Sequence, residues 1–379
     1  MRNEHHGWSI TELDHVPKTG INVMSTFSCG GGSSMGYKLA GCNVIAANDI
    51  DPEMAHHYKL NLKPDNYYLC PIKELLTMDL PQELFGIDIL DGSPPCSTFS
   101  TSSAKRESLW GKDKHFREGQ VKQVLSDLFF DYLDLVDRLN PKIAIAENVS
   151  GMLLGNAKGY TRAILRRFKE IGYHPQLFLL NASDCGVPQR RKRVFFCAFR
   201  DDLKLKPLVL NPKMEKVSVE RALADIELTE SEKSDCELDR PTDNLWWPLT
   251  RPGEGYHEAV LRMGLPIKLW NHIKIHPKKP SPTLTASDIL SHHSEQRRLC
   301  LREFKRLGSF PDDYQTENDK IGKYLIGMSV PPRMTEVVAV AICEQWLGVN
   351  YENNKEGQDK KKSRAQRESP NQGHGRSIP

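Results

Sequence analysis

The stretch GSPPCSTFS, residues 92–100, places Cys96 behind two prolines and in front of small hydroxyl residues. A free cysteine is only a few per cent thiolate at neutral pH, so a nucleophilic cysteine needs a setting that activates it. The prolines restrict the backbone before Cys96 and can hold its thiol at one point of a cleft. A buried structural thiol, the alternative, needs no such setting. We therefore treat Cys96 as a candidate nucleophile.

Glu147 and Asn148 form a second group that could do chemistry, at the end of the segment IAIAENVSG. The apolar residues before them predict a buried strand, and an acid and an amide at its end can face one cleft. The alternative is a strand that simply ends in glutamate, which is common.

Four consecutive cations form a third group, in CGVPQRRKR. Alternate residues of an extended segment face the same side, so Arg191 and Arg193 would act together. They could hold a polyanion or lie on a solvated edge, and the segment alone does not separate the two.

A glycine-rich turn, FSCGGGSSMG, follows the first apolar run. Such a strand-to-helix turn lets the backbone approach a ligand and presents helix N-terminal amides. Asp49, about twenty residues on, could accept hydrogen bonds from the hydroxyls of a ribose. Gly30, Gly32 and Gly36 are spaced one residue too wide for GxGxxG, which disfavours a nicotinamide oxidoreductase. A nucleoside cofactor is favoured over a plain tight turn.

The elements that position these groups alternate along the first 200 residues. Apolar runs predict strands at 21–28, 42–51, 85–95, 140–148, 174–183 and 193–200, and helical spacing predicts helices at 35–41, 128–139 and 160–173. This alternation predicts a parallel sheet covered on both faces, which binds ligands at the carboxyl ends of its strands. Asp49, Cys96 and Glu147 all fall at such ends.

The later part of the chain reads differently. Residues 201–290 are rich in proline, charge and tryptophan and have little periodicity, which predicts a smaller irregular domain. Helices are expected again at 297–308 and 332–348. Residues 351–379 hold very few apolar side chains after Tyr351, and we expect them to be disordered.

Composition and charge narrow the class of protein. The chain has 379 residues, 27% of them charged, and no window approaches a membrane-spanning apolar run. The N-terminus has no apolar signal-peptide core, so we expect a cytoplasmic protein. Nine scattered cysteines without a CxxC pair disfavour disulfides and zinc. His272 and His276 have HxxxH spacing but no acidic or cysteine partner beside them, so a surface loop is favoured over a metal site.

The net charge of +3 is carried by the C-terminal segment. Residues 351–379 hold seven lysines and arginines and four acids, an excess equal to that of the whole chain. The first 350 residues are therefore formally neutral. A polyanion would have to be bound through local basic clusters rather than through bulk charge.

Taken in order, these segments resemble the C5-cytosine DNA methyltransferases over about residues 21–347. The likeness runs through FSCGGGSSMG, NDID, GSPPCSTFS, LFFD, ENVSG, QRRKR, RRLCLREFKRLGSFPDDY and IGMSVPP. One such motif would be weak evidence, whereas eight in the family's order with compatible gaps are very specific.

The resemblance implies a reaction and a set of roles. It implies S-adenosylmethionine as methyl donor, S-adenosylhomocysteine as product, and no metal. Cys96 would attack C6 of a flipped-out cytosine, and Glu147 would contact N3 and the exocyclic amine, which requires a raised pKa for Glu147. Arg191, Arg193 and Asn148 would complete the catalytic set. The implied cofactor-binding residues are Phe27, Ser28, Cys29, Gly30, Gly31, Gly32, Asp49, Ile50, Pro94, Leu128, Ser329 and Val330.

The resemblance also implies a Rossmann-like, mostly parallel α/β sheet with helices on both faces and a smaller, irregular target-recognition domain. The expected division is a catalytic, cofactor-binding domain at 1–200, target recognition at 201–317, a return segment at 318–350 and a basic tail at 351–379. Residues 101–123 would form a mobile loop that closes over DNA.

This sequence departs from the family's usual pattern at five positions. Ser25 and Cys29 stand where aspartate and glycine are usual, and Pro71 stands where an adenine-contacting aspartate is usual. Ser97 replaces a frequent glutamine, and Met328 replaces an asparagine. These departures concern the cofactor pocket more than the candidate catalytic groups.

The expected partner is double-stranded DNA, bound by a monomer without a membrane, with a cognate restriction endonuclease as an open option. A restriction–modification, phage or solitary setting fits equally well. Two alternatives stay open: the same chemistry on tRNA, and a catalytically inactive DNA-binding relative. The long irregular region with adjacent tryptophans favours duplex DNA.

Overall fold

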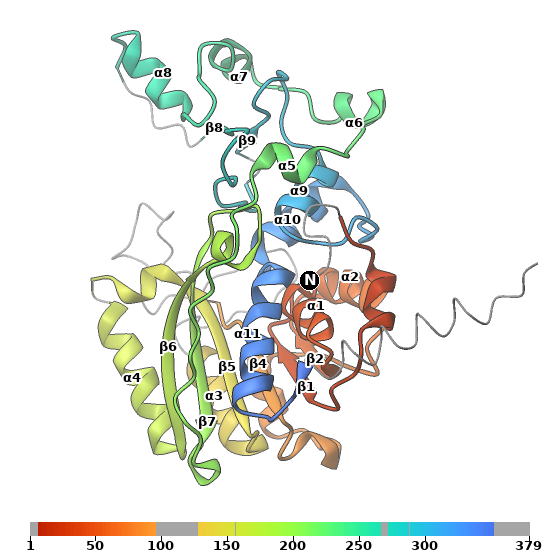
Figure 1. Ribbon diagram of the computed structural model, residues 1–379, viewed down its shortest axis with the longest axis vertical. Coiled ribbons are helices and arrows are strands. Elements are labelled where there is room, and N and C mark those ends of the chain that lie inside the picture. Colours follow the sequence, from red (N-terminus) through yellow and green to blue (C-terminus); the bar gives the residue numbers. More distant parts are fainter. Residues whose placement is uncertain (1–6, 96–127, 156, 267–271, 288, 352–379) are drawn as a thin grey trace, which may run out of the picture.

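The computed structural model describes residues 7–95, 128–155, 157–266, 272–287 and 289–351, and Figure 1 shows its two parts. The larger part is built on a seven-stranded sheet of order β3-β2-β1-β4-β5-β7-β6. Its strands are β1 Asn22–Thr26, β2 Asn43–Asp49, β3 Asn66–Leu69, β4 Ile89–Gly92, β5 Ile143–Val149, β6 Tyr173–Asn181 and β7 Lys192–Arg200.

The sheet is parallel from β3 to β5, and β7 runs antiparallel to both of its neighbours. This confirms the mostly parallel α/β sheet predicted from the sequence. The strand order reverses between β1 and β4. In sheets of this kind ligands bind in the crevice at the carboxyl side of such a switch point.

Helices cover both faces of the sheet. On one face α1 (Gly32–Leu39) and α11 (Pro332–Gln345) pack on a core that includes Val23, Ile89 and Ile145. On the other face α3 (Leu128–Leu139) and α4 (Ala157–Glu170) pack on a core that includes Met24 and Leu90. Consecutive strand residues point to opposite faces, so each buried strand supplies both cores and reads as a continuous apolar run.

Two further helices complete the larger part. They are α2 (Pro52–Leu62) and α10 (Asp319–Met328). Short 3-10 helices connect the other elements, at Ile10–His15, Ile72–Leu76, Gln82–Leu84, Ser150–Leu153, Ala182–Cys185 and Asp201–Leu203.

The expectation that no window approaches a membrane-spanning run was wrong, because helices α10 and α11 together have the length and apolar composition of such a span. The non-helical segment 329–331 separates them, and 67% of their most apolar window is buried inside the protein. Core helices of folded proteins meet the same criteria of length and composition, and the burial of this window agrees with a place in the core.

The smaller part stands at one end of the molecule, apart from the large sheet (Figure 1). Trp246, Trp247, Tyr256 and Val260 form its own small apolar core. Its elements are α5 Val219–Leu223, α6 Glu230–Ser234, α7 Pro241–Trp246, α8 Tyr256–Arg262, β8 Ile273–Lys274, β9 Leu290–Ser291 and α9 Leu301–Leu307. Helix α9 packs against α5 and α10, and so joins this part to the larger one.

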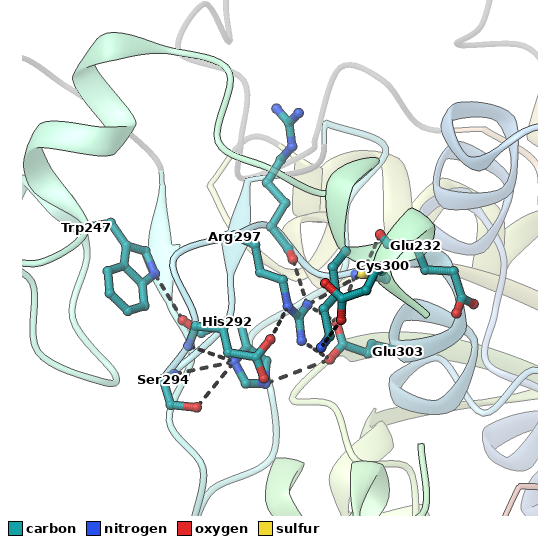
Figure 2. A network of polar contacts seen from close by, with 11 residues as sticks. Glu232, Trp247, His292, Ser294, Arg297, Cys300 and Glu303 are labelled. Carbon is teal, nitrogen blue, oxygen red and sulfur yellow. Dashed lines mark hydrogen bonds and ion pairs between the residues drawn. The ribbon is translucent and has the colours of Figure 1, made fainter. Parts of the chain in front are cut away.

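A buried polar network holds the smaller part together (Figure 2). Arg297 donates hydrogen bonds to both carboxylate oxygens of Glu303, at 2.7 and 2.9 Å. The backbone carbonyl of His292 accepts a hydrogen bond from Trp247 Nε1 at 3.1 Å. Burial lowers the pKa of His292 to about 4, so its ring is neutral and Nδ1 accepts from the backbone N–H of Glu295. The network therefore links α9 to the tryptophan core.

Candidate active site

The glycine turn between β1 and α1 adopts left-handed conformations. Phe27, Cys29 and Gly31 have φ values of +52°, +45° and +81°. A Cβ on Gly32 would lie 2.1 Å from the carbonyl oxygen of Val330. No side chain fits at Gly32, because the return segment of the chain lies directly against the turn.

Asp49 ends β2 beside this turn. Its Oδ2 accepts a hydrogen bond from the backbone N–H of Cys29 at 2.7 Å, and Oδ1 accepts one from Asp51 at 3.0 Å. Burial raises the pKa of Asp49, although these backbone donors oppose the shift. Each oxygen keeps a lone pair, so the oriented carboxyl can still accept from a ligand hydroxyl. Ile50, the next residue, is partly exposed.

Residues from both ends of the chain meet at the turn. Ser329 and Val330 follow α10 and are only 4% and 5% exposed. The hydroxyl of Ser329 lies near the thiol of Cys29 and lowers its pKa, but burial dominates and raises that pKa to about 12. Cys29 therefore stays a neutral thiol, with its sulfur 3.6 Å from that of Met54.

Glu147 and Arg193 form an ion pair across neighbouring strands. Arg193 Nε lies 2.8 Å from Glu147 Oε1, and the side chains are 16% and 10% exposed. The register of β5 and β7 sets Arg193 opposite Val149, so Glu147 is its diagonal neighbour on the same face. Burial raises the pKa of Glu147, while the charges of Arg193 and Arg191 oppose the rise. The direction agrees with the raised pKa that the chemistry requires.

Arg191 is used in another way. It is 2% exposed and donates from Nη1 to the carbonyl of Leu284 and from Nη2 to the carbonyl of Gly327, both at 2.9 Å. Leu284 lies beyond residue 200 in the smaller part, and Gly327 lies in α10. Arg191 thus ties the start of β7 to two distant segments, whereas Arg193 makes the contact with Glu147.

Asn148 holds the segment that leads to Cys96. It is 3% exposed, and its Nδ2 donates to the carbonyl of Pro94 at 2.9 Å. Its Oδ1 accepts from the backbone N–H of Val149 at 2.8 Å. The amide therefore bridges the end of β5 and the turn after β4.

The other expected pocket residues lie around the same end of the sheet. Leu128 begins α3 and is buried in the core beneath that helix, and Phe27 packs against the same core. Ser28 is 5% exposed and donates its backbone N–H to the carbonyl of Asn48 at 3.0 Å. Gly30 is buried as well.

Several expected features fall outside the described residues. These are Cys96 and Ser97, the loop at 101–123, and the tail from residue 352 onward. Within the described ranges, no cluster of three or more histidine, cysteine or acidic side chains could hold a metal ion.

Two residues that support the site were missed by sequence reasoning. The hydroxyl of Tyr314, which is 1% exposed, donates to the carbonyl of Gly30 at 2.8 Å. Gln189 is 1% exposed, donates to the carbonyl of Leu307 at 3.3 Å and accepts from the N–H of Leu284 at 3.1 Å. Both stand in recognisable segments, FPDDY and VPQRR, but their partners are far away in the sequence.

The sheet order, with its reversal between β1 and β4, defines an open α/β fold that binds ligands at the carboxyl ends of its strands. The family model for C-5 cytosine-specific DNA methylases matches residues 21–344, so the chain belongs to that family. It is an S-adenosylmethionine-dependent DNA (cytosine-5-)-methyltransferase. This confirms the resemblance drawn from the sequence motifs, and the tRNA alternative is not favoured.

Similar proteins extend over most of the chain. Type II methyltransferase M.NgoPII of Neisseria gonorrhoeae is 27% identical over 350 residues, which cover 85% of this chain and 95% of the relative. Type II methyltransferase M.MthTI of Methanothermobacter thermautotrophicus is 29% identical over 353 residues, covering 87% and 99%.

Solved structures agree in fold. A crystal structure titled as a prophage-encoded DNA modification methyltransferase of E. coli superimposes with a TM-score of 0.65 at 22% identity, covering 86% of this chain and 99% of that one. The DNMT2 structure from Spodoptera frugiperda gives a TM-score of 0.60 at 18% identity, covering 85% and 100%.

Proposed function

We propose that this chain methylates a cytosine flipped out of double-stranded DNA, with Cys96 as the nucleophile and Glu147 as the proton carrier. The observation that carries the proposal is the buried Glu147–Arg193 pair at the carboxyl end of the sheet. A carboxyl with a raised pKa, oriented by an arginine, suits a group that must share a proton with a base near neutral pH.

The chemistry explains why these groups are needed together. C5 of cytosine is a poor nucleophile, and addition of the Cys96 thiolate at C6 turns C5 into an enamine-like carbon. A proton held at N3 by Glu147 neutralises the charge that this addition pushes into the ring. After methyl transfer, a base removes the C5 proton, the thiolate leaves C6 and the ring is restored. A water chain suffices as that base.

The glycine turn and Asp49 fit a nucleoside cofactor. The turn lies at the carboxyl end of β1, and Asp49 would offer its oriented oxygens to ribose hydroxyls beside it. S-adenosylmethionine supplies the methyl group when bound, and leaves as S-adenosylhomocysteine. Leu128, Pro94 and Ile50 would border the pocket, and the residues at 27–32 and 329–330 would enclose it.

Arg193 would hold the Glu147 carboxyl in place, and Asn148 would hold the turn that carries the nucleophile. Arg191 would support the site indirectly, because its hydrogen bonds go to the backbone of the smaller part and of α10. We place the division between the catalytic and target-recognition domains near residues 200 and 317, with the return segment at 318–350.

The surface fits a nucleic acid, and the type II relatives favour duplex DNA as that substrate. Arg190, Lys192, Lys278 and Lys279 are exposed where the two parts meet, and the backbone N–H of Arg190 donates to the carbonyl of Ser281 at 2.8 Å. Such a local basic cluster can bind phosphates although the body of the chain is neutral, with strong salt dependence. The target base must be flipped out, because stacked bases block access to C6.

We further infer a monomer that works in the cytoplasm, without a metal. The names of the type II relatives support a place beside a cognate restriction endonuclease.

Labelled S-adenosylmethionine, offered with DNA and with tRNA in separate reactions, tests the function directly. Label on DNA at one recurring sequence, mapped by bisulfite sequencing, is the expected result. Label only on tRNA would select the RNA activity, and no label on either would identify an inactive binder. Cys96→Ala should abolish transfer and leave DNA binding largely intact. Methylation by Cys96→Ala would overturn the nucleophile assignment.

A further inference from the structure

Asp91 is a buried carboxyl that the proposed chemistry does not use. It lies in β4, five positions before Cys96, and is 2% exposed. No ion pair joins it to a cation within the described ranges, and burial raises its pKa to about 7. An acid buried without a cation costs stability, because its charged form loses hydration. A neutral polar side chain could accept the same hydrogen bonds with a smaller loss of stability, so folding alone does not account for an acid here.

Three hydrogen bonds join Asp91 to the elements on either side of the glycine turn. Ser25 Oγ on β1 donates to Oδ2 at 2.9 Å, and the Tyr37 hydroxyl on α1 donates to Oδ1 at 3.1 Å. Thr26 Oγ1 on β1 donates to the backbone carbonyl of Asp91 at 3.0 Å. Strand β1 enters the turn and α1 leaves it. One residue of β4 therefore holds both ends of the turn.

These hydrogen bonds lie at the switch point of the sheet. Ser25 and Asp91 are register partners in the β1–β4 pair, where the strand order reverses. On one side of this pair lies the turn assigned to the methyl donor, and on the other lies the strand end that precedes Cys96. Asp91 therefore lies between the two segments and is hydrogen-bonded to both elements that flank the turn.

We propose that Asp91 is a positioning residue that aligns the glycine turn with the end of β4, and thereby the methyl donor with the target base. This inference rests on the proposed function of the two segments. Methyl transfer requires a short, linear approach, and a misplacement of about 1 Å can cost about 10²-fold in rate. Ser25, the register partner of Asp91, carries only a hydroxyl, so the carboxyl of this pair stands on β4.

Asp91 also lies within electrostatic range of Glu147. The charge of Glu147, on the neighbouring strand, raises the pKa of Asp91. The other titratable groups whose pKa values respond to Asp91 are Tyr37 on α1, Tyr58 on α2, Tyr132 on α3 and Cys197 on β7. None of these neighbours carries a positive charge, so the hydroxyl donors of Ser25 and Tyr37 supply the bonds that favour the ionised form.

An exchange of the two side chains tests the proposal. Single-turnover methyl transfer, at saturating donor and DNA and normalised to folded protein, is measured for Asp91→Ser and for the double variant Ser25→Asp/Asp91→Ser. We expect Asp91→Ser to lower the rate at least about tenfold. The double variant should recover to within about threefold of the parent, because its carboxylate occupies the partner position. The KM for DNA should stay within about twofold in both.

Two conservative variants keep the test decisive if Asp91→Ser folds poorly. Tyr37→Phe removes one of the hydrogen bonds that Asp91 accepts. It should lower the rate of methyl transfer and weaken the binding of S-adenosylmethionine. Tyr173→Phe removes a buried hydroxyl that bonds the carbonyl of Pro141 at 2.6 Å, away from the turn, and should leave the rate unchanged.

Either of two results would overturn the proposal: a double variant no faster than Asp91→Ser, or Tyr37→Phe behaving like Tyr173→Phe. The single-turnover rate of methyl transfer can be measured whichever residue is the nucleophile. Failure of the Cys96 assignment, seen separately in Cys96→Ala, is therefore distinguishable from failure of the role of Asp91.

Discussion

Arg193 Nε lies 2.8 Å from Glu147 Oε1, and the two side chains are 16% and 10% exposed. A guanidinium this close ordinarily makes a carboxyl a stronger acid. Here burial outweighs the attraction, and the pKa of Glu147 is raised. The pair therefore combines fixed orientation with a proton that is held more tightly than usual, which is the combination that protonation of a cytosine ring demands.

Glu147→Gln removes the carboxyl proposed to carry the proton while it keeps the size of the side chain. We expect kcat to fall by about 10²- to 10⁴-fold, with the affinity for the methyl donor nearly unchanged, because the role proposed for Glu147 is toward the target base. Steady-state methylation and donor binding measured on the same preparation check this. An active Glu147→Gln enzyme would show that another group carries the proton.

Much of the fold could be predicted because local patterns report burial. The strands ending at Asp49 and in ENV read as apolar runs closed by polar residues, and parallel strands bring such ends together. The strand at 66–69 could not be read in this way, because it is a short edge strand without a fully buried residue. Helix α2 was also missed, although Asp51 caps it and Pro52 begins it.

The finer site geometry depends on partners that no local pattern reveals. Arg191 bonds carbonyl groups 93 and 136 residues away, so its separation in role from Arg193 appears only in the fold. Asp91 could have been noticed as an acid inside an apolar strand. Its partners Ser25 and Tyr37 lie on other elements, and the strand pairing that joins them is not readable from one sequence.

Asn148→Ala should release the turn after β4, because Asn148 Nδ2 donates to the carbonyl of Pro94. We expect kcat to fall by about 10- to 100-fold through loss of alignment, with a smaller effect on the KM for DNA. Asn66→Ala is the matched control, since Asn66 Nδ2 donates to the carbonyl of Ile45 at the far edge of the sheet. Equal losses in both variants would argue for a general effect on stability.

Gly32→Ala should disrupt the contact between the turn and the return segment. The added Cβ would lie 2.1 Å from backbone at Val330, which cannot move without shifting the segment after α10. We expect donor binding to be lost and the melting temperature to fall. Gly159→Ala, in an exposed position of α4 with nothing within 4 Å, should instead add up to about 1 kcal/mol of stability. Scanning calorimetry of both variants measures the melting temperatures, and titration calorimetry measures the binding of S-adenosylmethionine.

Arg297→Met should destabilise the smaller part, because it leaves Glu303 buried without its bidentate partner. The expected cost is about 3–5 kcal/mol. The double variant Arg297→Met/Glu303→Leu should recover much of it, because no buried carboxylate is then left without a partner. Glu295, which also pairs with Arg297, is half exposed and can be hydrated. Chemical denaturation measures both, and DNA binding by the double variant shows whether the pair also orients the tryptophan core. A double variant as unstable as the single one would contradict this explanation.

Asp91 should make the free energy of unfolding depend on pH. Its pKa is about 7 in the folded chain, against a usual value near 3.8. Well below pH 3.8 the carboxyl is protonated in both states and does not change the free energy of unfolding. As pH rises from about 4 to 7 the unfolded chain loses this proton first, so stability falls, by about 4 kcal/mol in total, and then levels off. Asp91→Asn should not show this dependence on pH, because asparagine does not ionise.

The difference in unfolding free energy between Asp91→Asn and the parent isolates the contribution of Asp91 from those of Glu147 and Asp49. Between pH 4 and 7 the variant should become progressively more stable than the parent, and above pH 7 the difference should stay constant. Urea denaturation at closely spaced pH values measures it. A difference independent of pH would mean that Asp91 ionises normally in the folded protein, with its charge stabilised by the hydroxyls of Ser25 and Tyr37 more strongly than burial opposes it.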